Sequence, residues 1–204
     1  MNDIRVIEKP DLIPWDDVAK CIFRGQATNN SKGFDMTFGH ISGVELQKSV
    51  NGGHCFVAIN EQNEIVGTLS VTFGNIKFWW HKGPAALYCY EAILPEFRNN
   101  LNRYFGLHKM AEDCIKHANI KVVWATTAEQ NETMLKINKI KKWKFVQYSP
   151  TVPGSNYYSI VMAKWLEGCP YKDCIITFMF KLSRFVVRFL YKPGKVFRFS
   201  LKKK

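Results

Sequence analysis

The sequence has no closely spaced pair of cysteines, and its first residues form no apolar run. The six cysteines are scattered along the chain and include no C-x-x-C pair, so we expect neither a zinc site nor a disulfide framework. The opening segment, MNDIRVIEKP, carries charges throughout and therefore does not resemble a signal peptide. These absences predict a chain that works in a reducing, cytoplasmic compartment without a metal cofactor.

A long uncharged apolar run is also missing. Residues 174–191 form the only stretch that resembles a membrane span, and they contain Lys181, Arg184 and Arg188. Each of these cations costs roughly 2.5–3.5 kcal/mol near the centre of a bilayer. We therefore do not expect this stretch to cross a membrane.

Acidic residues are nearly absent from the end of the chain. From residue 169 onward there are ten cations and one anion, so this tail carries +9 of the total net charge of +12 and leaves +3 for residues 1–168. Its cations Lys181, Arg184, Arg188 and Lys192 follow spacings of 3, 4 and 4, which predicts one cationic stripe on an otherwise apolar helix.

Such a helix is typical of segments that lie on an anionic membrane surface, and we expect residues 174–204 to do so. Packing on its own domain or on a second subunit is the alternative. The chain is accordingly divided into a domain over 1–168 and a basic amphipathic tail over 169–204. We expect the domain to fold without the tail, and the sequence leaves the oligomeric state open.

The hydrophobic pattern predicts an α/β layer architecture in the order βααβββαβαββ. A capping box, Ser42 with Glu45, marks the start of the second helix. A polar stretch from residue 25 should end the first helix, and residues 78–84 should form a loop. The predicted strands cover 4–7, 55–59, 65–73, 86–94, 121–125, 144–148 and 157–165, and the helices cover 15–22, 43–50, 107–118 and 132–142.

Two motifs at the expected separation resemble the GNAT superfamily of N-acyltransferases over roughly residues 1–165. Residues 94–98, Leu-Pro-Glu-Phe-Arg, look like the V-x-P-E-[YF]-R that ends the fourth strand of that family. Residues 131–138 are similar to its N-x-x-M-x-x-I-N segment after the fifth strand. The resemblance implies a mixed, mostly antiparallel sheet with splayed central strands and flanking helices. It also implies that acetyl-CoA or another acyl-CoA inserts its pantetheine arm beside Ile93 and Leu94, and that the acyl group passes to an amine.

The family's pyrophosphate loop, [RQ]-x-x-G-x-[GA], is altered here. In one register Arg98 is the family arginine and Leu101 replaces the first glycine; in the other, Arg103-x-x-Gly106 matches and His108 replaces the last small residue. Asparagine tolerates left-handed backbone conformations, and arginine binds phosphate, so an Asn-rich loop can still hold the donor. The resemblance thus assigns donor binding to Arg98, Asn99, Asn100, Asn102, Arg103 and Gly106.

Three further residues are candidates for the chemistry. Glu91, on the fourth strand, is the candidate general base, although a solvent-facing strand residue is the alternative. Asn138 stands where many relatives carry a tyrosine that protonates the leaving thiolate. Tyr148, our candidate, or Tyr157 can replace that tyrosine, another residue can supply the proton, or the thiolate can leave toward water. Asn131 can bind the pantetheine arm, cap the following helix, or do both. Strand alternation places Tyr88 and Tyr90 on one face.

The predicted function is N-acyl transfer from an acyl-CoA to an amine, with an amino sugar or amino-acid lipid precursor at the membrane as the suggested acceptor. A non-catalytic GNAT scaffold that acts as a membrane-associated binding module is the alternative, and an acyl carrier protein could replace CoA as the donor. The basic run over residues 136–144 is interpreted as a solvated face or a phosphate contact. We expect no nucleic-acid partner, because no nucleic-acid-binding motif accompanies this run.

Overall fold

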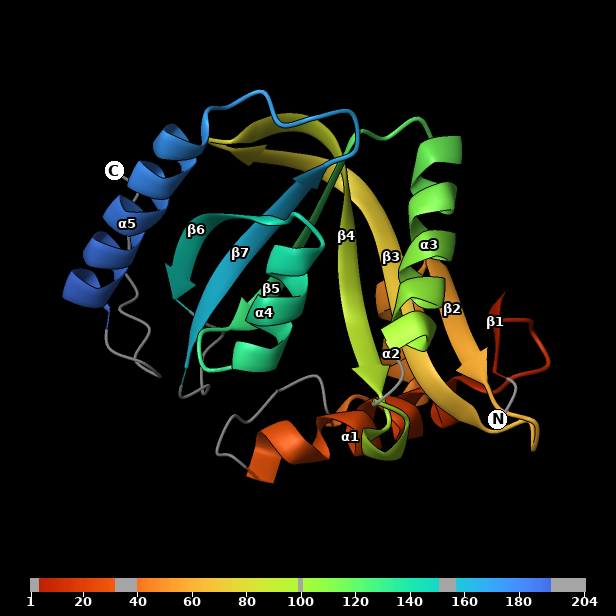
Figure 1. Cartoon of the computed structure of the whole chain (residues 1–204). Coiled ribbons are helices and arrows are strands. Elements are labelled where there is room, and N and C mark those ends of the chain that lie inside the picture. Colours follow the sequence, from red (N-terminus) through yellow and green to blue (C-terminus); the bar gives the residue numbers. More distant parts are fainter. Residues whose placement is uncertain (1–3, 32–39, 99–100, 151–156, 192–204) are drawn as a thin grey trace, which may run out of the picture. The chain divides into compact units, whose positions relative to one another are not determined.

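The computed structural model describes residues 4–31, 40–98, 101–150 and 157–191 (Figure 1). The predicted order of strands and helices is confirmed, including the helix predicted in the C-terminal tail. The first elements are β1 (Arg5–Glu8), α1 (Trp15–Ser31), α2 (Gly43–Val50), β2 (His54–Ile59), β3 (Ile65–Phe78), β4 (His81–Ile93), the 3₁₀ turn η2 (Pro95–Phe97) and α3 (Leu101–His117). They are followed by β5 (Val122–Ala128), α4 (Glu132–Ile140), β6 (Lys144–Pro150), β7 (Tyr158–Trp165) and α5 (Asp173–Leu190).

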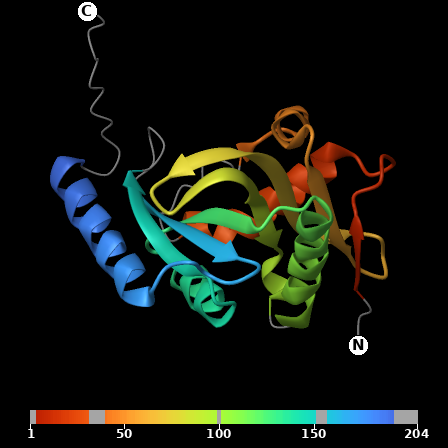
Figure 2. The ribbon, with the colours of Figure 1, turned by 90° about the horizontal axis from the view of Figure 1, so that it is seen from above.

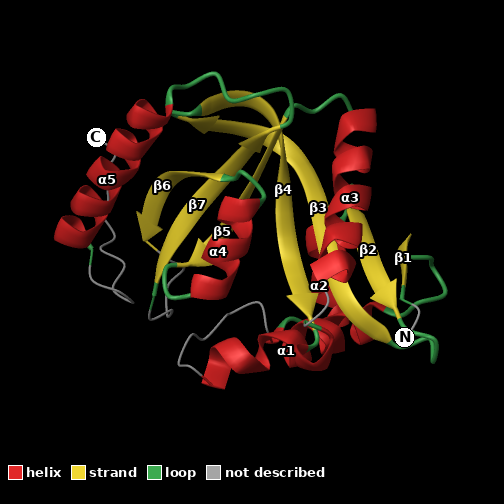
Figure 3. Ribbon diagram, in the orientation of Figure 1, coloured by secondary structure: helices red, strands yellow, loops and turns green. Residues whose placement is uncertain are grey.

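The strands form a mixed, mostly antiparallel sheet, as predicted (Figure 3). Their order is β1-β2-β3-β4-β5-β7-β6. Strands β1 to β4 pair antiparallel in sequence, and β6 pairs antiparallel with β7. Strand β4 pairs with β5 in parallel at Ala86–Val123 and Leu87–Trp124.

The chain separates into two compact units. The first unit contains residues 1–125 and 165–168, and the second contains residues 126–164 and 169–204. Each unit has its own packing and is described by itself.

Helices cover both faces of strands β1 to β4 in the first unit. Figure 2 shows α1 and α3 on opposite faces of these strands. On the α1 side, the predicted apolar stripe of α1 is buried, with Val18 and Ile22 packed against Leu46 of α2 and Val57 of β2. The predicted capping box that starts α2 is present, because the Ser42 and Glu45 side chains each bond the other residue's backbone. Amphipathic periodicity thus positions both helices.

Helix α1 does not end before Gly25, as the sequence predicted, but continues to Ser31. A Cβ atom at Gly25 would lie 2.8 Å from Cβ of Ala92 on β4, so only glycine allows this close approach of helix and strand. The glycine that looked like a helix breaker is therefore a packing residue. Its position brings the second half of α1 against the end of β4.

Residues 78–84 form the end of a long hairpin and not the predicted loop. Strand β3 continues to Phe78, and β4 begins at His81 after a two-residue turn. Trp80 is 1% exposed; its ring stacks on Phe78 at 5.2 Å and meets the edge of Trp165 at 6.1 Å. Phe78, Trp80 and Trp165 thus form an apolar cluster at the far end of the hairpin, because large rings bury more apolar surface when they pack together.

Helix α5 packs on β6 within the second unit (Figure 1). Ile176 and Val187 are buried, and the Ser183 hydroxyl accepts a hydrogen bond from the Tyr148 amide at 2.9 Å. The Phe180 ring lies 6.1 Å from that of Phe145. Helix α5 thus covers strand β6, and whether residues 1–168 fold without the tail stays a prediction that deletion tests. Within the described residues, no helix has the length and apolar character needed to cross a membrane.

Candidate functional site

A β-bulge interrupts β4 close to its end. Ser70 pairs with Cys89 and Thr68 pairs with Ala92, so two residues of β4, Tyr90 and Glu91, lie opposite one residue of β3. Tyr90 adopts a positive φ of 53°, a conformation that costs a non-glycine residue on the order of 1 kcal/mol or more. The surrounding packing must hold this strained backbone in place.

The bulge reverses which side chains share a face. Tyr90 packs against the apolar cluster between the sheet and helices α1 and α2. Tyr88 instead contacts His108 of α3, with the two rings edge to face at 5.1 Å. The prediction that Tyr88 and Tyr90 share a face is therefore wrong, because one inserted residue shifts the alternation. Glu91 comes to lie on the same side as Tyr88, toward α3.

Glu91 and His108 form a closely paired, mostly buried acid–base couple. The Glu91 carboxylate oxygen Oε1 lies 2.7 Å from Nε2 of His108, and the two side chains are 17% and 5% exposed. Beside them, burial raises the pKa of Tyr88 well above its usual range, so this phenol keeps its proton. The arrangement places one carboxylate that can accept a proton next to an imidazole that holds it in position.

The Arg98 side chain connects the end of β4 to helix α1. The Arg98 guanidinium donates to the carbonyl oxygen of Ile93 at 3.0 Å and also to that of Gly25. Arg98 thus ties the end of the strand to the helix. Burial lowers the pKa of Arg98, and these backbone acceptors satisfy its charge from within the protein. The contact of Arg98 with phosphate stays a prediction, beside this observed role at the strand end.

Two neighbours of Gly25 reinforce this connection. The Gln26 amide donates to the Glu91 carbonyl oxygen at 3.2 Å, and Arg24 pairs with Glu96 at 3.0 Å. Gln26 is buried, so its hydrogen bond fixes the backbone of the candidate base directly. The sequence does not predict these contacts, because the periodicity of the first helix is readable only as far as residue 22.

Gly106 lies inside helix α3 and not in the loop before it. The helix begins at Leu101, and a Cβ atom at Gly106 would lie 3.0 Å from the Val6 side chain of β1. Gly106 thus has a packing role, and both registers of the pyrophosphate loop stay predictions. Asn99 and Asn100 lie outside the described residues, as do the side chains of Asn102 and Arg103.

Ile93 and Leu94 end the strand that carries Glu91. Ile93 pairs with Gly67 of β3, and the Leu94 amide donates to the carbonyl oxygen of Val66 at 2.9 Å. The Leu94 side chain is 2% exposed. Both contacts lie on the edge of β4 that faces β3, and they fix the position of the β4 end.

Asn131 begins helix α4 in the second unit. Its side-chain oxygen accepts a hydrogen bond from the Met134 amide at 3.3 Å, which confirms the predicted helix cap. Asn138, which replaces the family tyrosine, is 2% exposed, and an amide cannot donate a proton as an acid.

Tyr148 is engaged in a cluster of its own unit. Its hydroxyl donates to the Glu129 carboxylate, and Nε of Arg188 lies 3.4 Å from the same hydroxyl. Burial and then the hydrogen bond to Glu129 raise the pKa of Tyr148 to about 12. The side chain is 1% exposed and packs against Phe180 of α5. These contacts give Tyr148 a structural role in its own unit, and its role as general acid stays a prediction.

Comparison with solved structures identifies the fold. Three acetyltransferase structures match at probability 1.00: one of the GNAT family from Streptococcus pneumoniae, one of the GNAT family from Staphylococcus aureus Mu50, and the ribosomal-protein-S5-alanine acetyltransferase from Vibrio fischeri. Their TM-scores are 0.59, 0.57 and 0.56, at 12%, 16% and 15% identity. The matches cover 80%, 80% and 83% of this chain, and 99%, 99% and 96% of the other chains. No protein-family model and no curated protein matches the sequence. The chain thus has the GNAT fold.

Proposed function

We propose that this protein is an N-acyltransferase that moves an acetyl or longer acyl group from an acyl-CoA to an amine. The observation that carries the proposal is the buried Glu91–His108 couple on the bulged strand of a GNAT fold. A strained backbone and a buried carboxylate at one place are typical of catalytic sites.

In the proposed reaction, Glu91 takes a proton from the ammonium form of the acceptor. The freed nitrogen lone pair attacks the thioester carbonyl carbon, the carbon–sulfur bond breaks, the CoA thiolate leaves, and the second nitrogen proton passes to the thiolate or to solvent. His108 is a positioning residue in this proposal, because its Nε2 contacts Glu91 Oε1 and orients the carboxylate. A backbone amide of the bulged strand is the proposed donor to the developing oxyanion.

The beginning of α3 supports an anionic donor. The sequence of its first turn contains no acidic residue, whereas the first turns of α1, α2, α4 and α5 each contain one or more. The free amides at a helix N-terminus bind phosphate groups, and an acidic side chain there would oppose them. We assign the pyrophosphate to the segment 98–103 and the pantetheine arm to the backbone at Ile93 and Leu94. Asn131 remains a proposed pantetheine contact besides its capping role.

The acceptor is proposed from the basic end of the chain. We infer an amine that is made or used at the cytoplasmic face of a membrane, such as an amino sugar on a lipid carrier or an amino-acid lipid headgroup. The net charge of +9 over residues 169–204 supports this location. In this proposal residues 1–168 catalyse the transfer, and residues 169–204 hold the protein at the membrane.

Acetyl-CoA is expected to stabilise the full-length protein against heat. At 100 times the dissociation constant a ligand adds about 2.7 kcal/mol, which corresponds to a rise in Tm of roughly 5–10 °C for a chain of this size. Differential scanning fluorimetry with acetyl-CoA, and with acetate as the control, measures this shift. An unchanged Tm at millimolar acetyl-CoA would contradict the donor site and favour the non-catalytic scaffold.

A further inference from the structure

Helix α5 has two apolar faces, and among the residues that the structure describes only one of them packs against the rest of the second unit. The stripe of residues 176, 180, 183 and 187 packs toward β6 and Tyr148. At roughly 100° per residue, the residues at 175, 178, 182, 185 and 189 fall on the opposite side of the helix. The large apolar residues of α5 that are exposed are Ile175 (46%), Phe178 (64%), Leu182 (44%), Phe185 (69%), Val186 (41%), Phe189 (80%) and Leu190 (50%).

We propose that this outer face of α5, defined by Phe178, Leu182, Phe185 and Phe189, docks in the plane of an anionic phospholipid bilayer. The face is too continuous and too aromatic for scattered surface residues, and three phenyl rings that are mostly exposed mark an interaction site. The proposal concerns a surface of the second unit only and does not depend on the acyl transfer proposed above.

The cations beside the outer face favour a membrane over other partners. Lys181, Arg184 and Arg188 lie along one flank of the face, where long basic side chains can reach lipid headgroups while the rings enter the acyl boundary. The tail from residue 169 carries ten cations and one anion. A second copy of the chain would bring two such charges together, whereas an anionic bilayer complements them.

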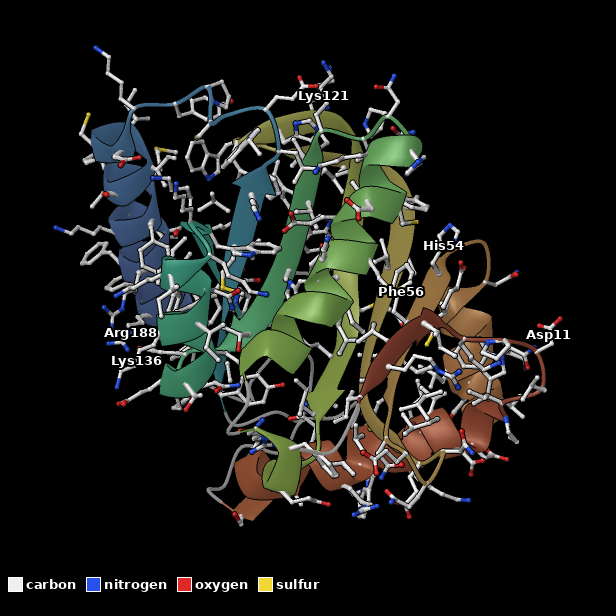
Figure 4. The ribbon with its side chains drawn as sticks, turned by 45° about the vertical axis from the view of Figure 1, so that its right-hand side comes forward. Asp11, His54, Phe56, Lys121, Lys136 and Arg188 are labelled. Atoms are coloured by element: carbon white, nitrogen blue, oxygen red, sulfur yellow. The ribbon has the colours of Figure 1, made fainter. Side chains whose placement is uncertain are left out.

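The contacts of Glu129 determine where two arginine side chains of α5 lie. This carboxylate bonds Arg184 at 3.0 Å and also Arg188, and Figure 4 labels Arg188 on the helix. Both arginines are thus paired on the side of Tyr148, while about half of each side chain stays exposed at 46% and 48% and can still meet headgroups. The aromatic row is the outermost part of α5, so we expect the apolar face to dominate docking and the charges to assist it.

The test is flotation of the full-length protein with vesicles of phosphatidylglycerol and phosphatidylcholine, and with vesicles of phosphatidylcholine alone. We expect binding to the anionic vesicles that weakens as salt rises. Replacing Phe178, Phe185 and Phe189 with Ser should lower the partition coefficient by about 1,000-fold, since each buried phenyl ring contributes on the order of tenfold or more. Far-UV circular dichroism and Tm should stay unchanged, because all three side chains are mostly exposed.

A matched control removes as many exposed apolar residues elsewhere. Leu12, Val44 and Ile140 are 84%, 61% and 71% exposed and lie outside α5, so their replacement with Ser should leave vesicle binding intact. Three outcomes would overturn the proposal: no binding of the wild type to anionic vesicles, equal binding of the Phe-to-Ser variant, or a stable dimer by light scattering that this variant abolishes. The shift of Tm by acetyl-CoA, measured on the same samples, reports separately on the proposed function.

Discussion

Replacing Glu91 with Gln is expected to lower kcat by about 10²–10⁴-fold while the affinity for acetyl-CoA stays nearly unchanged. The amide has the same shape as the carboxylate but cannot take a proton from the acceptor amine. Initial rates of thiol release, together with calorimetric titration of acetyl-CoA, measure the two effects separately. Glu61→Gln is the matched control, because Glu61 lies on the exposed β2–β3 turn and its replacement should leave both quantities at wild-type values.

Variants of His108 test whether Glu91 and His108 act together. His108→Gln keeps a side-chain N–H that can bond Glu91, so it should retain more activity than His108→Ala. The double variant of Glu91→Gln with His108→Ala should lose no more than Glu91→Gln alone, because residues that act together are strongly non-additive. Additive losses in the double variant, or wild-type turnover in Glu91→Gln, would return both residues to a structural role.

Deleting residues 169–204 is expected to unfold the second unit. The deletion removes the buried side chains of Ile176 and Val187, at roughly 1.5–3 kcal/mol each, and the Ser183 partner of the Tyr148 amide, at about 1 kcal/mol. It also leaves Glu129 without the two arginines that now pair with it. Together these losses approach the whole stability of an ordinary domain.

Urea unfolding followed by circular dichroism measures this effect. Deletion of residues 192–204 is the control: helix α5 ends at Leu190, and every contact named above lies before that point. We expect the shorter deletion to keep the wild-type midpoint and slope. If the longer deletion also keeps both, the packing of α5 on β6 contributes nothing measurable, and the tail is a dispensable appendage.

The order of the elements could be predicted because each one follows a simple periodicity. Helix α1 shows its stripe at Val18 and Ile22, and the capping box of Ser42 and Glu45 marks the next helix. The sequence did not predict the close approach of α1 to β4. Gly25 resembles a helix breaker, but in the structure a Cβ atom at this position would lie 2.8 Å from Cβ of Ala92. A contact between residues so far apart along the chain leaves no local signal.

Of the candidate pair, Glu91 could be predicted from the sequence and His108 could not. The resemblance pointed to Glu91, but the bulge at Tyr90 carries no glycine to mark its positive φ. Without the bulge, strand alternation turns Glu91 away from Tyr88, and its partner His108 cannot be inferred. For α5 the amphipathic pattern was readable, yet both sides of the helix are apolar, so only the contacts of Ile176 and Val187 show which side faces β6.

The most direct test of the account is the stoichiometry of acyl transfer. Acetyl-CoA is incubated with the full-length protein and a panel of amino sugars, amino acids and aminolipids, while free thiol is followed by absorbance and products by mass spectrometry. The account predicts that at least one amine gives N-acetylated product and free CoA in equal amounts. Thiol release without any acylated amine, or neither product with any amine although acetyl-CoA binds, would contradict N-acyl transfer.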